Sequence, residues 1–140
     1  MKWEKVKLGD IAAFSNGVNF NKSDYGYGIK LINVSDFGNK LFPHYETLTE
    51  VKKEAVRNVD ILDEGDIIFV RSNGNKDLVG RCMIITKNDY QLTFSGFTIR
   101  LRINDKNNCS PLFLTYHFKS KLFRKSISGT AVGANIQNLS

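Results

Sequence analysis

The chain has 140 residues, of which 41% are hydrophobic and 24% charged, and its formal net charge is +6. A chain of this length and composition usually forms one globular domain with its own core, so we expect residues 1–140 to be a single compact domain. The N-terminus lacks the apolar core of a signal peptide, and no apolar run approaches the ~20 residues of a membrane-spanning helix. We therefore expect a soluble, cytoplasmic protein with reduced cysteines.

Basic charge is concentrated in the second half of the chain. Residues 1–70 contain nine Lys and Arg against eleven Asp and Glu, a net charge of −2, whereas residues 71–140 contain eleven against three, a net charge of +8. Such an asymmetry indicates a polyanionic partner or an anionic membrane surface. A generic basic surface, common in ordinary cytosolic proteins, is the alternative.

The first half of the chain predicts two short helices and one strand. Asp10 suits the N-cap or first turn of a helix that ends near residues 16–17. Residues 29–34 are typical of a strand, and the Asp-Phe-Gly-Asn sequence at 36–39 closes it with a turn. Residues 48–59 place apolar side chains near helical spacing after a polar start, which predicts the second helix.

The second half predicts three strands before its helical end. A turn at 63–66 leads into the apolar run 67–70, which is typical of a buried strand. Residues 81–86 form the next strand. Residues 97–103 alternate apolar and polar side chains with a period of two, so one face of this strand is apolar and the other carries two arginines.

A helix begins at Ser110-Pro111, with Ser as the cap and Pro at the first helical position. Leu114, Phe118 and Leu122 form an apolar row that extends this helix to Arg124. The elements together predict an α+β fold: a mostly antiparallel or mixed twisted β-sheet of about four or five strands, with two or three short helices.

The loop Arg-Ser-Asn-Gly-Asn-Lys at 71–76 directly follows the apolar strand 67–70 and consists almost wholly of hydrogen-bond donors. Arg and Asn side chains pair bidentately with guanine and adenine edges, and Lys neutralises phosphate. Gly74 allows close approach of the backbone to a ligand. The composition favours contact with nucleic acid, although a solvated hairpin tip has the same residue types.

Motifs for catalysis are weak or missing in this sequence. Gly-Thr-Ala-Val-Gly at 129–133 resembles a phosphate-binding loop only faintly, because the required Lys-Ser/Thr is missing and the segment follows a helix. His44 and His117 do not stand at metal-ligand spacing, and His117 is expected to be a packing residue. A nuclease usually needs two or three carboxylates to hold Mg²⁺, and those of the basic half lie in turn-like contexts. We expect no catalytic site, metal or cofactor, and a small nuclease is the least favoured alternative.

Several segments, in this order, resemble the target recognition domain of type I restriction-modification specificity (S) subunits. They are the opening Trp3–Ile11, the mid-domain strand Gly65–Arg71, the glycine of Val79–Arg81 that enters the next strand, the closing helix Phe118–Ile127, and Gly129 with Asn135–Ile136. The resemblance spans about Trp3 to Leu139. Each motif is short, and their order and spacing together carry the match.

The resemblance implies a non-catalytic module that reads double-stranded DNA sequence for a restriction-modification complex. DNA methyltransferase (modification) subunits and restriction subunits would be its partners, and they would carry S-adenosylmethionine and ATP chemistry. Subunits of this kind carry two such domains and a long spacer helix, which this sequence lacks. Methyltransferase docking, pairing with a second recognition domain and homodimerisation therefore stay open. The alternative is a protein-interaction or decoy half-subunit that does not read DNA.

Side-chain chemistry rather than the resemblance selects the candidate DNA-binding residues. Contacts with DNA are expected from Arg71, Asn73, Asn75, Lys76, Arg81, Arg100 and Arg102, among which Arg71, nearest the strand end, is the first candidate for a base contact. Phosphate contacts are expected from Lys119, Lys121, Arg124 and Lys125. Positive charge near a helix C-terminus is also favourable through the macrodipole alone. Thr130 and Asn135 are weaker candidates, and Tyr25 and Tyr27 are expected to pack beneath a loop rather than on a base. Single-stranded RNA binding is not favoured because the positive strand face lacks stacking aromatics.

Overall fold

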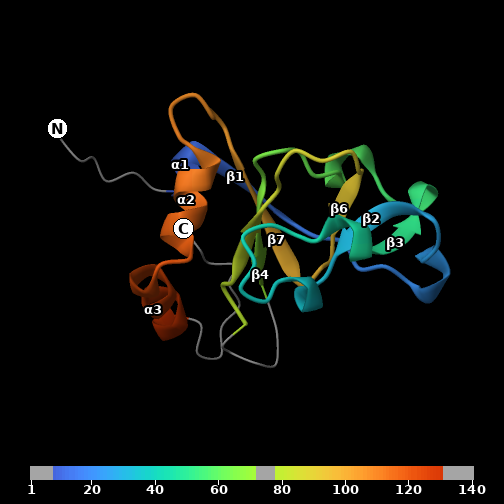
Figure 1. Ribbon diagram of the computed structural model, residues 1–140, viewed down its shortest axis with the longest axis horizontal. Helices are drawn as coiled ribbons and strands as arrows, with labels where there is room; N and C mark the ends of the chain where they lie inside the picture. Colours follow the sequence, from blue (N-terminus) through green and yellow to red (C-terminus); the bar gives the residue numbers. More distant parts are fainter. Residues whose placement is uncertain (1–7, 72–77, 131–140) are drawn as a thin grey trace.

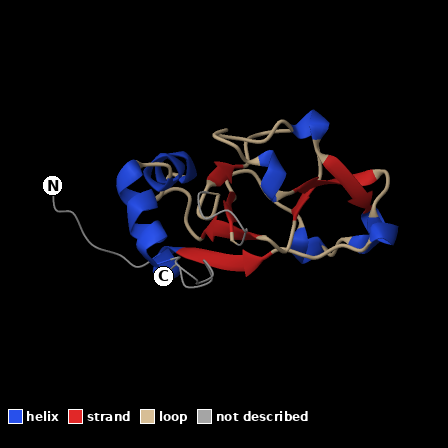
Figure 2. Ribbon diagram, turned by 90° about the horizontal axis from the view of Figure 1, so that it is seen from below, coloured by secondary structure: helices blue, strands red, loops and turns tan. Residues whose placement is uncertain are grey.

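The computed structural model describes residues 8–71 and 78–130, and predictions that concern residues 1–7, 72–77 and 131–140 lie outside it. Within the described residues, two β-sheets lie side by side, with the α-helices gathered at one end (Figures 1 and 2). The α-helices and strands are α1 (Leu8–Ile11), β1 (Ala12–Asn16), β2 (Gly28–Ile32), β3 (Thr49–Lys52), β4 (Ile67–Val70), β5 (Cys82–Ile84), β6 (Leu92–Phe94), β7 (Thr98–Ile103), α2 (Pro111–Phe118) and α3 (Lys121–Thr130). Single-turn 3-10 helices occupy much of the connections around the smaller sheet.

The larger sheet has the order β1-β7-β4-β5 and is antiparallel throughout. The smaller sheet has the order β3-β2-β6 and is mixed, because β2 pairs antiparallel with β3 and parallel with β6. The α+β prediction with antiparallel and mixed sheets is confirmed. The predicted number of strands was too low, since three-residue strands such as β6 are too short to show a period.

The central strand β4 is buried along its whole length. It pairs with β7 from Ile67 opposite Leu101 to Val70 opposite Thr98. One cluster of apolar side chains packs on one face of the larger sheet toward the smaller sheet, and a second packs on the other face beneath α2 and α3. A strand with apolar side chains on both faces is what the unbroken run at 67–70 predicted.

Two helix predictions were wrong, and in both cases part of the segment forms a strand at the edge of a sheet. The predicted helix to residues 16–17 ends at Ile11, and residues 12–16 pair with β7 as β1. The predicted helix 48–59 is β3 followed by two 3-10 turns. Both segments lie against a neighbouring strand that supplies hydrogen-bond partners, and such pairing overrides weak helical spacing.

The C-terminal helix begins as predicted but breaks in the middle. The Ser110 hydroxyl accepts from the Phe113 N–H at 3.2 Å, and Pro111 occupies the first turn. The helix ends at Phe118, and Ser120 starts α3 by accepting from the Phe123 N–H at 3.2 Å. Leu122 is therefore 80% exposed instead of continuing the buried apolar row. No helix within the described residues is both long and apolar enough to cross a bilayer.

A buried ion pair joins β7 to the turn that precedes β4. Arg102 donates from Nε to Asp66 Oδ1 at 2.9 Å and from Nη2 to Asp66 Oδ2 at 2.8 Å. Asp66 Oδ2 also accepts from the Asp63 N–H at 2.7 Å, and Gly65 in this turn has φ of +91°, which favours glycine. The Asp66 side chain has no exposed surface, whereas that of Arg102 is 32% exposed. The carboxylate therefore ties one turn and two strands together.

Replacing the buried acid should destabilise the fold much more than replacing its exposed neighbour. Asp66→Asn keeps the volume but removes the charge that Arg102 requires, and we expect the free energy of unfolding to fall by about 3 kcal/mol, the low end of the range for broken buried pairs because Arg102 is partly exposed. Asp63 also contacts Arg102, at 3.1 Å, but its side chain is 64% exposed. Asp63→Asn should cost less than about 1 kcal/mol. Urea denaturation measures both losses, and equal losses would contradict the assignment.

Candidate nucleic-acid interface

The C-terminal end of β4 and the N-terminal end of β5 form the base of a hairpin. The Val70 N–H donates to the Arg81 carbonyl at 2.8 Å, and the Gly80 N–H donates to the Val70 carbonyl at 2.9 Å. These bonds place Arg71 and Arg81 at the same end of the larger sheet, and we call this pair the hairpin base. The predicted base-reading residues Asn73, Asn75 and Lys76 lie between them, outside the described residues.

Arg71 is held in place but retains a donor without a partner. Its backbone N–H donates to the Phe97 carbonyl at 2.8 Å, and its Nη1 donates to the Gly96 carbonyl at 3.1 Å. Its Nε is buried and has no acceptor among the described residues. Because a buried donor without a partner costs about 1–3 kcal/mol, an acceptor supplied at this position would be stabilising.

Phe97, whose carbonyl accepts from the Arg71 N–H, carries an exposed aromatic ring. Phe97 is 57% exposed, although the period-two pattern placed it on the apolar face of the strand. It precedes β7, which begins at Thr98, and the glycine at position 96 is the signal in the sequence for a turn there. A Cβ atom at Gly17 would clash with the Ser95 backbone, so glycine at position 17 allows the chain there to pack closely against Ser95. Phe97 offers an apolar surface suited to a thymine methyl group.

Three predicted phosphate-contact or base-contact residues come together beside the hairpin base. Arg81 donates from Nη1 to the Gly38 carbonyl at 3.1 Å, and Lys119, after α2, donates from Nζ to the Lys40 carbonyl at 2.8 Å. Arg124 of α3 lines the same cavity as Arg81 and Lys119. We call these three side chains the basic cluster. Burial lowers the pKa of Lys119, and the charges of Arg124 and Arg81 lower it further, while the Cys82 thiol acts in the opposite direction.

The remaining candidate DNA-binding residues belong to the C-terminal part of the chain, and not all of their side chains are described. Lys121 and Lys125 are exposed on α3, the helix that also carries Arg124. Thr130 is the last residue of α3, and its side chain is outside the description, as is Asn135. The structure thus places Lys121, Arg124, Lys125 and Thr130 on α3, with Lys119 in the turn before it.

Arg100 and Arg102 are engaged inside the protein rather than grouped with the hairpin base. Arg100 donates from Nη1 to the Val59 carbonyl at 2.9 Å and lies 5.6 Å from the centroid of the Phe94 ring. Burial lowers the pKa of Arg100, whereas the hydrogen bond to Asp66 raises the pKa of Arg102. Contact of Arg100 and Arg102 with bases stays a prediction, and their hydrogen bonds within the protein give both a structural role.

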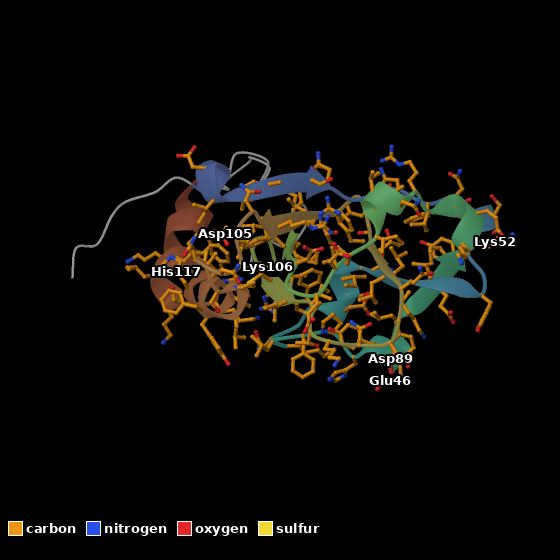
Figure 3. All side chains as sticks on the ribbon, turned by 90° about the horizontal axis from the view of Figure 1, so that it is seen from above. Glu46, Lys52, Asp89, Asp105, Lys106 and His117 are labelled. Atoms are coloured by element: carbon orange, nitrogen blue, oxygen red, sulfur yellow. The ribbon has the colours of Figure 1, made fainter. Side chains whose placement is uncertain are left out.

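The two loop tyrosines lie far from the basic cluster. Tyr27 is 94% exposed and precedes Gly28, which pairs with Lys52. Figure 3 shows Lys52 at the opposite end of the molecule from His117 of α2. Tyr27, and to a smaller extent Tyr25 at 42% exposed, is therefore more exposed than predicted.

The described residues do not assemble a cluster of metal ligands. No three His, Cys, Asp or Glu side chains among them are placed to hold a metal ion. His117 lies 5.9 Å from the Phe118 ring and 5.5 Å from the Phe123 ring between centroids. These contacts agree with a packing residue.

Comparison with known proteins identifies the family. The profile described as "Type I restriction modification DNA specificity domain" matches residues 1–140, the whole chain. The chain belongs to this family. The resemblance seen in the sequence is thereby confirmed, and the hairpin base belongs to a specificity domain.

This specificity domain is similar to two curated type I restriction enzyme specificity subunits. It is 25% identical over 145 residues to the StySPI subunit of Salmonella potsdam, an alignment that covers 98% of this chain and 30% of that protein. It is 29% identical over 122 residues to the EcoKI subunit of Escherichia coli (strain K12), which covers 87% of this chain and 25% of that protein. The chain spans less than a third of either relative.

Solved structures share the fold of the specificity domain. The HsdS subunit from Thermoanaerobacter tengcongensis has a TM-score of 0.66 at 19% identity, over 91% of this chain and 29% of that one. The S subunit from M. genitalium has a TM-score of 0.59 at 16% identity, over 99% of this chain and 31% of that one. At these identities the comparison establishes the architecture alone.

The two cysteines should differ sharply in reactivity. Cys82 is buried in β5, and burial raises its pKa from 9.0 to about 11, whereas Cys109 is half-buried. Because the thiolate is the reactive form, Cys82 in the folded protein should stay unlabelled by iodoacetamide at pH 8 while Cys109 is alkylated. Mass spectrometry of the digested protein measures both. Labelling in urea, where the two should react alike, is the control, and equal labelling in the folded state would contradict the burial of Cys82.

Proposed function

We propose that this specificity domain is a non-catalytic module that recognises a sequence in double-stranded DNA and supplies target specificity to a type I restriction-modification complex. The observation that carries the proposal is the placement of Arg71, which the Gly96 carbonyl holds at the base of a donor-rich loop. Membership of the family supports it, as do two relatives that are specificity subunits.

The proposed contacts fall into two groups with different roles. Arg71, with the loop residues Asn73, Asn75 and Lys76, is assigned to base edges, because Arg pairs bidentately with guanine O6 and N7 and Asn with adenine. The basic cluster and the exposed Lys121 and Lys125 are assigned to phosphates, which position the protein without specifying sequence. Arg100 and Arg102 are assigned to the fold, since both are engaged internally.

Methylation and cleavage are assigned to partner subunits rather than to this domain. We propose that residues 1–140 form one recognition domain that works with methyltransferase and restriction subunits and with a second recognition domain. The support is indirect: the similar proteins are specificity subunits, and one structure of the same fold comes from work on assembly of a type I restriction-modification system.

Arg71→Ala should lower affinity for the cognate duplex selectively. The target is first obtained by selecting bound sequences from a random duplex pool, and a scrambled version provides the reference. Loss of a bidentate contact costs about 1–3 kcal/mol, roughly 5-fold to 150-fold in affinity, on the cognate sequence only. Fluorescence anisotropy at fixed salt measures the dissociation constants for both duplexes.

Two lysines serve as matched controls for Arg71. Lys125→Ala should weaken cognate and scrambled duplexes alike, since it is assigned to phosphate. Lys52→Ala, at the opposite end of the molecule, should change neither. Equal losses on both duplexes for Arg71→Ala would contradict base reading. Capture of a methyltransferase without any duplex binding at low salt would overturn the proposed function in favour of a decoy.

A further inference from the structure

The turn between β6 and β7 places Phe97 at the end of the larger sheet. Strands β4 and β7 lie side by side, and their ladder sets Val70 opposite Thr98 (Figure 1). Arg71 and Phe97 are the next opposing pair, and the Arg71 N–H donates to the Phe97 carbonyl at 2.8 Å. Side chains directly opposite each other in an antiparallel pair stand on the same face, with Cβ atoms about 5 Å apart. Phe97 and Arg71 therefore share one face at this end of the sheet.

Phe97 continues an apolar row of β7 beyond the part of the face that is covered. Ile99 and Leu101 follow it at intervals of two residues and are buried, whereas Phe97 is 57% exposed. Leu101 belongs to the cluster that packs beneath α2 and α3. A single exposed apolar side chain is ordinary on a protein surface. The position of the ring opposite Arg71, rather than its exposure alone, therefore carries the argument.

Hydrogen bonds fix the backbone on both sides of Phe97. The Gly96 N–H donates to the Val18 carbonyl at 3.0 Å, and the Phe97 N–H donates to Ser95 Oγ at 3.3 Å. The Thr98 hydroxyl donates to the Ser95 carbonyl at 2.7 Å. A group that is held in place before binding loses little conformational freedom on binding. The turn therefore presents the ring from a backbone of fixed position.

The same turn also holds Arg71. The Gly96 carbonyl accepts from Arg71 Nη1 at 3.1 Å, and the Phe97 carbonyl accepts from the Arg71 backbone. A duplex with a base edge at Arg71 therefore meets Phe97 as well. Successive base pairs are about 3.4 Å apart along the helix axis, so a separation of about 5 Å between the two Cβ atoms corresponds to a neighbouring base pair.

The chemistry of the phenyl ring selects one kind of base edge. A polar base atom covered by the ring loses water without gaining a hydrogen-bond partner, which is unfavourable. The C5-methyl group of thymine is the apolar group that base edges present in the major groove. We propose that Phe97 is a specificity-determining residue that contacts the C5-methyl group of a thymine, in the base pair next to the guanine that Arg71 contacts. The inference rests on the proposed function and adds one base pair to the sequence that the domain reads.

Exchange of thymine for uracil in the DNA tests the contact, because uracil lacks only the methyl group. The cognate duplex is selected from a random pool, and the guanine is the position at which Arg71→Ala relaxes discrimination. Deoxyuridine at the neighbouring thymine should weaken binding by the unmodified domain roughly 4-fold, the effect of burying one methyl group. Fluorescence anisotropy at fixed salt measures this ratio. Phe97→Ala should bind both duplexes equally, whereas Tyr27→Ala, which removes an exposed ring next to β2, should keep the 4-fold ratio.

The possible outcomes separate this contact from the proposed function. Equal losses for Phe97→Ala on the thymine and uracil duplexes would show a ring that packs on DNA without reading thymine, and the proposal would be wrong. A selected site without a thymine next to the guanine would overturn it as well. The comparison of the two duplexes with the unmodified domain needs no variant, so it holds even if Phe97→Ala does not fold. Sequence-selective binding without a methyl effect would refute the contact and leave the proposed function standing. Absence of any sequence-selective duplex binding would refute the proposed function and this contact with it.

Discussion

The ion pair between Arg102 and Asp66 fixes where β4 begins, and the position of the candidate interface follows from it. Asp66 is the residue immediately before β4, and two parallel hydrogen bonds to a planar guanidinium allow little freedom in how β4 and β7 are placed. With Ile67 opposite Leu101, the four buried residues of β4 deliver Arg71 to the end of the sheet. Because β4 is apolar on both faces, its own pattern does not fix its register, and the pairing of Asp66 with Arg102 supplies that constraint.

The same interaction explains why Arg71, Arg100 and Arg102 have different roles although their side chains are chemically identical. Arg100 and Arg102 stand on the face of β7 that residues 59–66 cover, and their guanidinium groups are engaged by Val59 and Asp66. Arg71 stands directly after β4, and among the described residues its side chain donates to the Gly96 carbonyl. Position within the sheet, rather than residue type, separates the structural arginines from the candidate binding arginine.

Local patterns in the sequence predicted much of the fold, whereas elements that depend on contacts between distant residues were not predicted. The strand 67–70 and the Ser110 cap depend on neighbouring residues only, and both appear in the structure. Residues 12–16 and 49–52 become strands because β7 and β2 lie beside them, which no local pattern reveals. The basic end of the molecule was predictable from charge. The engagement of Arg102 was not, since Asp66 lies 36 residues away in sequence.

The placement of the proposed contacts separates affinity from specificity. The basic cluster comes from the residue before β5, the residue after α2, and α3, and carbonyls of a segment bonded to the sheet hold Arg81 and Lys119, so a change there disturbs packed elements. The residues proposed to read bases lie mostly in a short loop between β4 and β5. Loops tolerate substitution far better than the elements they connect. A duplex whose phosphates are bound by the basic cluster would meet different hydrogen-bond donors whenever the loop sequence changes. A specificity domain built this way can therefore change its target sequence while it keeps its fold and its contacts with the DNA backbone.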